Sequence, residues 1–389
     1  MKLFFIVDNN QPHASGGGYY APFKFAEFLA KRGHEVSIYA VSDFGWAKST
    51  DHLTIIYRPS IARKDRIRRK LDKFLSGLCD YVLLRSKIWK MRPDWILGVL
   101  TDSAIKASRI GREFNIPVAN FVYECPPWIE SWVGSKRFKE GFVGYTKRLW
   151  TNTREAYLYS DVLFPNSELS RTYNQQWLDG KIVAEPIFPG IDPDQMPYEA
   201  HENHRNESGT YQLLYVGRLA QNKNVDLLIQ SVLKLRTPAI LHICGEGPDN
   251  KRLQEIAGES SAILFHGYVS DADLWSRFRT CDLVLFPSSF EGFGMPPMQA
   301  LYFGKPCLVA DIPIFRSLYG NYLEYFTPGH VEGLSGSIER LLSDPAYRYR
   351  RGQAGRVFVL QRFSWSSSAE RIEKILLSHT RPLPPQRSV

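Results

Sequence analysis

The chain has 389 residues and a formal net charge of +9 at pH 7. Its 44% apolar and 23% charged residues are ordinary for a soluble globular protein, and the length predicts two or three domains. No apolar run approaches the ~18 residues of a membrane-spanning helix, which excludes that class of protein. The basic excess favours an acidic partner such as nucleotide phosphates, anionic lipid or nucleic acid, although a mildly basic surface without such a partner explains it equally well.

The cysteines indicate a reducing environment. The five cysteines are Cys79, Cys125, Cys244, Cys281 and Cys307. Their number is odd, they are scattered along the chain, and none forms a pair with metal-ligand spacing. The apolar N-terminal run, residues 1–8, is too short for a signal peptide and is typical of a first strand. We therefore expect a cytoplasmic protein, with attachment to the cytosolic face of a membrane as an open alternative.

The N-terminal residues predict a β-α-β unit. A strand at 3–7 leads through a polar loop to Gly16–Gly18, a helix ends near Gly33, and a second strand follows at 36–40. This order is the usual start of a parallel, doubly wound sheet. The glycines permit close approach of a ligand to the backbone, or form a flexible loop. Their spacing does not match the dinucleotide-binding fingerprint. A dehydrogenase therefore remains an alternative only because Asp43 follows the second strand.

Two stretches of the first half combine cations with apolar side chains. Residues 61–78 predict a basic amphipathic helix that lies either on anionic lipid or with its apolar stripe in the core. Residues 124–150 interleave tryptophans and other aromatics with lysines and arginines. Such a segment lines an acceptor groove, stacks on sugars, meets a bilayer surface or packs in the core.

The second half repeats the alternation of strands and helices. Residues 201–209 contain no strongly apolar residue and predict a linker, and a new series of strands begins at 211. Two halves of similar size, each rich in βα units, predict two Rossmann-like domains with a cleft between them. Clefts of this kind are common ligand sites.

The most informative stretch is 287–304. An apolar strand at 282–286 runs into a glycine-bearing turn that contains Glu291. Pro296 and Pro297 then suit a helix N-terminus, and Gly304 is placed to end that helix. Helix N-termini attract anions because their first N–H groups have no internal partner. A carboxylate beside such an end predicts a ligand with both an anionic group and hydroxyls, such as a nucleotide-sugar.

Two further loops are expected at the same edge, since ligands of open α/β sheets bind at the carboxyl ends of strands. Arg218 follows one strand, and Lys223 lies five residues after it. The two cations suit the binding of a diphosphate, or they simply belong to an ordinary basic surface loop. Residues 244–248 form another strand-to-glycine turn.

The order of these motifs resembles glycosyltransferase family 4, the group 1 glycosyltransferases, which are retaining enzymes with the GT-B fold. The motifs are Gly217-Arg218 with Lys223, Gly245–Pro248, Phe265–Tyr268, Pro287–Gly294 and Gly304–Pro306. The resemblance is strong over 211–317 and looser before it. It implies an acceptor domain at 1–192, a linker at 193–210, a donor domain at 211–364 and a helix at 365–380 that returns to the first domain.

The resemblance also implies roles for individual residues. Arg218 and Lys223 would hold the donor diphosphate and stabilise the leaving nucleotide, and Glu291 would bind sugar hydroxyls. Further donor contacts are implied at Gly17, Gly18, Gly217, Tyr268, Gly292, Phe293, Gly294, Met295 and Gln299. The family usually has a glutamate for the ribose hydroxyls where this chain has Gln299.

A catalytic residue from the first domain is less clearly marked. Many family members carry a histidine where this chain has Glu124, which either orients an acceptor hydroxyl or supports its neighbours; His13 is a weaker candidate. The triplets Asp192–Asp194 and Asp271–Asp273 are candidate metal ligands, but Asp271 suits a helix cap. We expect no essential metal and no cofactor besides the nucleotide-sugar substrate.

The sequence thus predicts a retaining glycosyltransferase of cell-surface glycan biosynthesis. It would move a hexose, mannose from a GDP donor first and UDP-linked sugars second, to a lipid-linked or polysaccharide acceptor. An anionic membrane surface at 61–78 is a possible further partner, and nucleic acid is not expected. The alternatives are a sugar-nucleotide epimerase and a non-catalytic nucleotide-sugar-binding protein.

Overall fold

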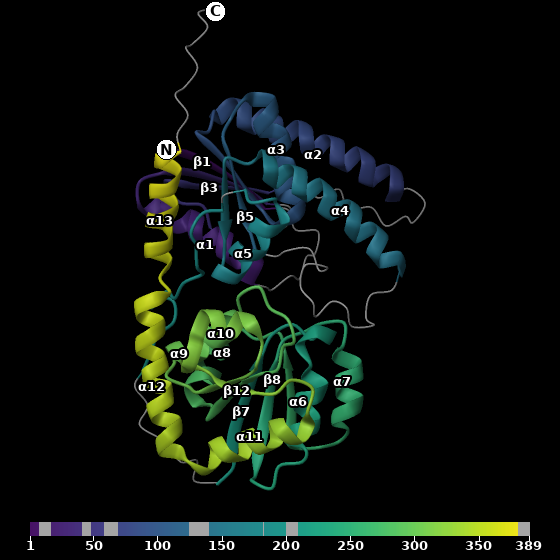
Figure 1. Cartoon of the computed structure of the whole chain (residues 1–389), viewed down its shortest axis with the longest axis vertical. Coiled ribbons are helices and arrows are strands. Elements are labelled where there is room, and N and C mark those ends of the chain that lie inside the picture. The colour runs from purple at the N-terminus through teal and green to yellow at the C-terminus, as the bar shows by residue number, and fades with distance from the viewer. Residues whose placement is uncertain are drawn as a thin grey trace, which may run out of the picture. The chain divides into compact units, whose positions relative to one another are not determined.

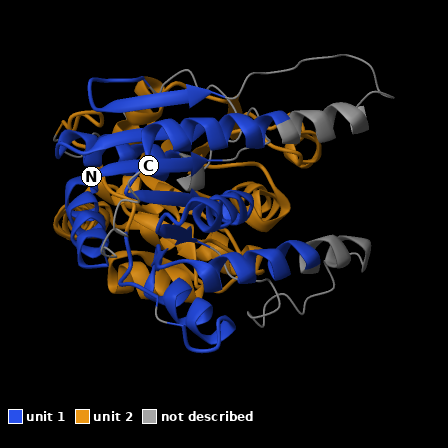
Figure 2. Ribbon diagram, turned by 90° about the horizontal axis from the view of Figure 1, so that it is seen from above, with its two compact units in different colours: residues 1–187, 365–389 blue, residues 188–364 orange. Residues whose placement is uncertain are grey.

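The computed structural model describes most of the chain. The described ranges are 1–7, 17–40, 48–57, 69–123, 140–181, 183–199 and 209–379, with the backbone alone at 17–19, 69–78 and 140–147. The chain divides into two compact units (Figure 2). Unit 1 comprises Met1–Ile187 and Trp365–Val389, and unit 2 comprises Phe188–Ser364.

Unit 1 is built on a six-stranded parallel sheet in the order β3-β2-β1-β4-β5-β6. Its strands are β1 (Lys2–Val7), β2 (Glu35–Ala40), β3 (Leu53–Tyr57), β4 (Trp95–Val99), β5 (Val118–Val122) and β6 (Val162–Pro165). The edge strand β3 was not expected, since its residues lie between polar segments and are only partly buried.

Helices accompany this sheet in Figure 1. They are α1 (Gly17–Lys31), α2 (Arg69–Met91), α3 (Leu100–Phe114), α4 (Glu140–Tyr159), α5 (Glu168–Trp177) and α13 (Trp365–Ser378). Gly17 and Gly18, expected in a loop, form the first turn of α1.

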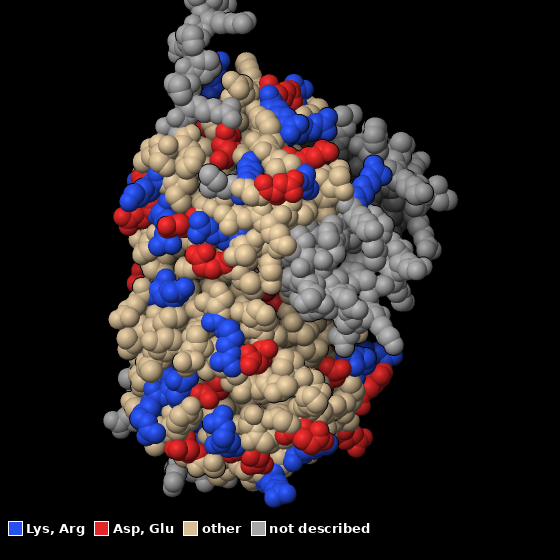
Figure 3. All heavy atoms as spheres, viewed as in Figure 1, with Lys and Arg blue, Asp and Glu red and all other residues tan. Residues whose placement is uncertain are grey.

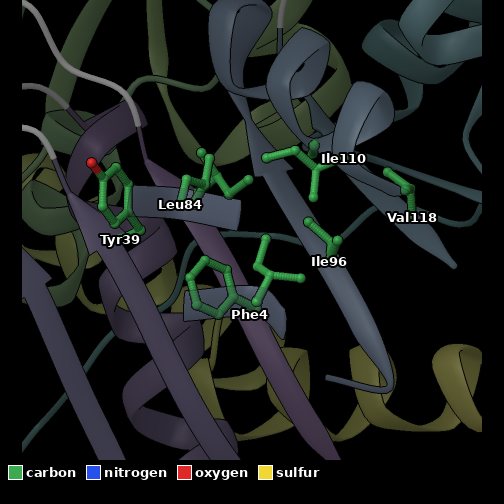
Figure 4. Close-up of a cluster of buried hydrophobic side chains, with 9 residues drawn as sticks. Phe4, Tyr39, Leu84, Ile96, Ile110 and Val118 are labelled. Carbon is green, nitrogen blue, oxygen red and sulfur yellow. The ribbon is translucent and has the colours of Figure 1, made fainter. Parts of the chain in front are cut away.

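The core of unit 1 lies on both faces of the sheet, because successive residues of a strand point to opposite sides. Phe4 on β1 packs with Ile96 on β4, Leu84 on α2 and Ile110 on α3 (Figure 4). The continuous apolar strands of the sequence are therefore explained by burial on both faces.

Helix α13 returns from the end of unit 2 to pack against α1. The Trp365 ring meets Phe25 edge-on at 5.3 Å and Tyr20 at 6.0 Å. Farther along α13, Glu373 accepts a hydrogen bond of 2.7 Å from Arg32 Nε and pairs with His34 Nε2 at 3.0 Å. A buried aromatic anchor and a surface carboxylate thus attach the two ends of the chain to one another.

Replacing Trp365 by leucine should lower the free energy of unfolding by about 2 kcal/mol, because the indole is 1% exposed and leucine leaves part of its space empty. Chemical denaturation followed by circular dichroism measures the change. The matched control is Trp89→Leu, on a side chain 61% exposed in the same unit, which should shift stability by no more than about 0.5 kcal/mol. Equal effects of the two substitutions would contradict the anchoring role.

Unit 2 repeats the architecture with the sheet order β12-β11-β10-β7-β8-β9, again all parallel. The strands are β7 (Tyr211–Val216), β8 (Ala239–Cys244), β9 (Ile263–Gly267), β10 (Leu283–Phe286), β11 (Cys307–Ala310) and β12 (Glu324–Phe326). Its helical elements are η2 (Gln221–Lys223), α6 (Val225–Val232), α7 (Asn250–Ala257), α8 (Asp271–Thr280), α9 (Met295–Tyr302), α10 (Pro313–Tyr319), η3 (Gly320–Tyr322), α11 (Val331–Ser343) and α12 (Pro345–Arg362). The prediction of two doubly wound parallel sheets is confirmed.

Two details differ from the sequence-based expectations. The cap of α8 is Ser270, not Asp271: the Ser270 hydroxyl accepts a hydrogen bond from Asp273 N at 3.2 Å, and Asp271 is the first helical residue. Unit 2 begins at Phe188, so residues 188–192 belong to it, where Ile191 forms an isolated bridge with Ser364. Residues 200–208, within the predicted linker at 193–210, lie outside the described residues.

Candidate functional site

The loops that follow three neighbouring strands of unit 2 are joined through their backbones. Gly217 N, after β7, donates to Cys244 O at 3.0 Å, and Gly245 N, after β8, donates to Gly267 O at the end of β9 at 2.8 Å. Leu219 N adds a bond of 2.9 Å to Glu246 O. The glycine motifs of the sequence therefore form one continuous rim at the carboxyl edge of the sheet.

Lys223 and Glu291 form an ion pair on this rim. Their side chains are 17% and 11% exposed, and Lys223 Nζ also lies 5.6 Å from the centre of the Phe286 ring. Burial and the nearby Glu291 charge raise the pKa of the Tyr215 hydroxyl well above its usual value. That hydroxyl stays neutral and donates to Arg218 O at 3.2 Å.

Asparagines link the loop of Lys223 to the loop of Glu291. Asn224 Nδ2 donates to Pro287 O at 3.0 Å, and Asn222 O accepts from Ser289 N at 2.9 Å. Asn222 and Asn224 were missed in the sequence, and the Asn-Lys-Asn run after Arg218 is the only signal that marks them. These hydrogen bonds hold the Lys223 loop against the Glu291 loop, so that the two charged side chains lie in contact.

Helix α9 begins directly after the Glu291 turn. Its cap residue Gly294 has φ 81° and ψ 73°, a left-handed conformation that glycine adopts without strain, and Tyr319 Oη donates to Gly294 O at 3.0 Å. Pro296 and Pro297 occupy the first turn as predicted. The Phe293 ring is buried against Phe363, at 5.5 Å between centroids, so at this position the backbone, not the side chain, is available to a ligand.

The other predicted site residues of unit 2 lie on the same rim or on α9. Arg218 is exposed, and among the described residues its guanidinium has no hydrogen-bond or ion-pair partner. Tyr268, the residue after β9, is 67% exposed. Gln299 is partly buried on the second turn of α9.

The predicted site residues of unit 1 are described only in part. Glu124, His13 and Gly16 lie outside the described residues, so their predicted roles stay predictions. Gly17 and Gly18 begin α1, where the first N–H groups of a helix have no internal partner.

The segment that contains this rim matches a family of known proteins. Residues 198–358, which hold every unit 2 site residue named above, match the family model described as glycosyl transferases group 1. A glycogen synthase of Mycobacterium tuberculosis is 29% identical over 203 residues, which are 50% of this chain and 48% of that protein. The serotype-specific mannosyltransferase WbdA of Escherichia coli is 28% identical over 167 residues, which are 40% of this chain and 20% of that protein.

The chain thus spans about half of the first of these relatives and less of the second. Among solved structures, Anabaena Alr3699/HepE in complex with UDP and glucose aligns with a TM-score of 0.74 and 16% identity, over 97% of this chain and 100% of that one. This likeness shows the fold alone, and with the two six-stranded parallel sheets it confirms the predicted GT-B fold.

Proposed function

We propose that this chain transfers a sugar from a nucleoside diphosphate to an acceptor hydroxyl, since residues 198–358 match the family model described as glycosyl transferases group 1. The observation that carries the proposal is the partly buried Lys223–Glu291 pair between the glycine rim and the start of α9. A cation for a diphosphate and a carboxylate for sugar hydroxyls here lie side by side, as one nucleotide-sugar would need them.

Each charged residue has a distinct task in this reaction. Lys223 and the exposed Arg218 bind the diphosphate and stabilise the negative charge that develops on the leaving nucleotide. Glu291 accepts hydrogen bonds from sugar hydroxyls, and the N–H groups of 292–295 approach the sugar or the phosphates. Lys223 and Glu291 neutralise each other before the donor binds, which lowers the free-energy cost of holding either charge partly buried.

The finer points of the mechanism are part of the proposal. Transfer proceeds with retention of the anomeric configuration, and Glu124 orients the acceptor hydroxyl. The two cations take the place of a divalent ion, so EDTA should leave the activity unchanged. A loss of activity in EDTA that added Mg²⁺ or Mn²⁺ restores would overturn metal independence.

For the donor we propose GDP-mannose, with a UDP-linked sugar as the second candidate. The likeness to a mannosyltransferase supports the first, and the structural likeness to a protein solved with UDP and glucose supports the second. Thermal unfolding with UDP, GDP and ADP separates them, because a ligand that binds the folded state raises its stability by mass action. Stabilisation by none of the three would contradict the proposed function.

An activity assay then separates transfer from its alternatives. Donor consumption that depends on an acceptor supports a transferase, whereas equal consumption without acceptor, with a sugar-nucleotide product, supports an epimerase. Binding of the diphosphate without any turnover, including slow donor hydrolysis, supports a non-catalytic binding protein.

We propose a lipid-linked or polysaccharide acceptor, reached from the cytosolic face of a membrane, as in the synthesis of cell-surface glycans. None of the helices that the structure describes combines the length and hydropathy of a membrane span. Residues 61–68 lie outside the described part, but the second half of α2 exposes Val82 and Trp89 beside Lys87 and Lys90. Exposed apolar and basic side chains on one helix support contact with anionic lipid, which co-sedimentation with anionic and neutral vesicles tests.

On the face of the molecule in Figure 3, described Lys and Arg side chains alternate with Asp and Glu. The described side chains therefore form no large basic field on that face, as a nucleic-acid-binding surface would. This agrees with the proposal of a small anionic substrate and a limited membrane contact.

Gln299→Glu should tighten binding of the nucleoside diphosphate about fivefold, because a carboxylate makes a stronger hydrogen bond to ribose hydroxyls than a neutral amide. Isothermal calorimetry measures the change in Kd. The control is Gln254→Glu on α7, an exposed residue of the same unit, which adds the same charge and should leave Kd unaltered. An unchanged Kd for Gln299→Glu would mean that the glutamine already binds the ribose well.

A further inference from the structure

Two histidines of unit 2 stack on one another beside the rim. His242 on β8 and His266 on β9 lie with their ring centroids 5.1 Å apart and an interplanar angle of 12°. His242 Nδ1 is 2.9 Å from His266 Nε2, and His242 Nε2 is 2.7 Å from Gln212 Oε1 on β7. The contacts thus run across three adjacent strands.

Arg277 on α8 contacts both rings. Its Nη1 lies 3.2 Å from His242 Nδ1 and its Nη2 lies 3.1 Å from His266 Nδ1. A guanidinium can only donate, so both Nδ1 atoms are acceptors and each ring carries its hydrogen on Nε2. His266 Nε2–H then shares the single lone pair of His242 Nδ1 with Arg277 Nη1, and His242 Nε2–H donates to Gln212 Oε1. All four ring nitrogens are used, and both rings are neutral.

The strand that carries His266 is irregular at this point. Ile243 pairs with Phe265 and Cys244 pairs with Gly267, so His266 is one extra residue in β9. A bulge of this kind re-aims the chain and is frequent beside functional sites. Here it precedes Gly267, whose carbonyl accepts from Gly245 N, and the exposed Tyr268.

We propose that His242, His266 and Arg277 are positioning residues: they fix the bulged end of β9, and thereby place Tyr268 where it can contact the nucleobase of the donor. Protonation of the two histidines then weakens donor binding. The inference rests on the proposed function and deepens it. None of the three residues is required to touch the donor. They act through the backbone of 266–268, where a planar base can stack on the exposed tyrosine.

The dependence on pH has a definite sign. Burial, and then the positive charge of Arg277, lower the pKa of His266; burial, then His266 and Arg277, lower that of His242 to about 4. Cys244 also faces Arg277, and burial raises the pKa of its thiol to about 11, so the thiol stays neutral. The cluster is therefore intact at neutral pH. As the pH falls toward 4, each proton removes an acceptor of Arg277 and adds a positive charge beside it.

The test uses Arg277→Met in the full chain, with Arg279→Met as the matched control; Arg279 is on the same helix and donates to Pro197 O at 3.2 Å. Calorimetry at pH 7.5 measures Kd for GDP, UDP and inorganic pyrophosphate. We expect the nucleotide that binds wild type to bind Arg277→Met about tenfold more weakly, which corresponds to about 1.4 kcal/mol. Pyrophosphate, which lacks a base, should bind both proteins within about twofold, and Arg279→Met should match wild type.

A second variant tests the pH dependence. His242→Gln with His266→Asn removes both titratable rings, so its nucleotide Kd should change less between pH 7.5 and pH 4 than that of wild type. Ionisation of the phosphates affects both proteins alike and cancels in this comparison.

Steady-state kinetics of Arg277→Met give a further readout. At saturating donor, kcat of Arg277→Met should stay within about twofold of wild type while KM for the donor rises.

The outcomes separate this inference from the proposed function. Equal nucleotide binding by wild type and Arg277→Met, or an equal loss for nucleotide and pyrophosphate, overturns the inference alone. Failure of wild type to bind GDP, UDP or ADP overturns both. Should Arg277→Met not fold, Arg277→Lys keeps the charge and one donor, and an intermediate loss of nucleotide affinity is then expected; unaltered affinity in Arg277→Lys overturns the inference.

Discussion

Lys223→Ala should lower kcat/KM by about 10²–10³-fold, because it removes a cation that stabilises the leaving diphosphate in the transition state. It should also lower the free energy of unfolding by about 2–3 kcal/mol, since Glu291, 11% exposed, loses its partner. Steady-state kinetics and chemical denaturation measure the two effects. The structure predicts that they have separate causes.

A double variant separates the two causes. Lys223→Met with Glu291→Gln leaves no unpaired charge, so stability should return to within about 1 kcal/mol of wild type while activity stays low. The control is Lys234→Ala, which breaks an exposed ion pair with Glu332 and should cost no more than about 0.5 kcal/mol. Recovery of activity with stability in the double variant would show that the pair is only structural.

Gly245→Ala should abolish most of the activity and lower the free energy of unfolding by about 3 kcal/mol, for reasons of backbone geometry. Gly245 has φ 144°, and a Cβ atom there would overlap the Gly217 carbonyl oxygen. Backbone cannot move aside as a flexible side chain can, so the loops after β7 and β8 would separate. Donor titration and denaturation of the purified variant measure the loss.

The matched control is Gly329→Ala. Gly329 also has a positive φ, 86°, but a Cβ there meets no atom within 4 Å. Only conformational strain of about 1 kcal/mol is expected, with normal donor binding. If both alanine variants bind donor like wild type, the close packing of the two loops has no role in the site.

Much of the site follows from local sequence. The turn with Glu291, the prolines of α9 and the strand-to-glycine transitions at Gly217 and Gly245 were all placed from residue type and spacing, since each is a local conformational requirement. Their common edge follows from a general rule of parallel sheets. The cap at Ser270 in place of Asp271 and the unexpected β3 show the limit of such reasoning, because neighbouring polar residues cap equally well and short edge strands have little pattern.

The sequence by itself determined the alternating α/β elements, the two similar halves and the residue types of a nucleotide-sugar site, because hydrophobic period and turn chemistry act over a few residues. Only the tertiary structure decided which of these residues meet. Lys223 and Glu291 are 68 positions apart, and His242 lies 35 from Arg277. Their pairing depends on strand order and on the bulge in β9, which have no local signal, and on the asparagine links between loops, which only the Asn-Lys-Asn run marks. Charge and hydrogen-bond partnerships are properties of the folded sheet edge, and so are the predictions that rest on them.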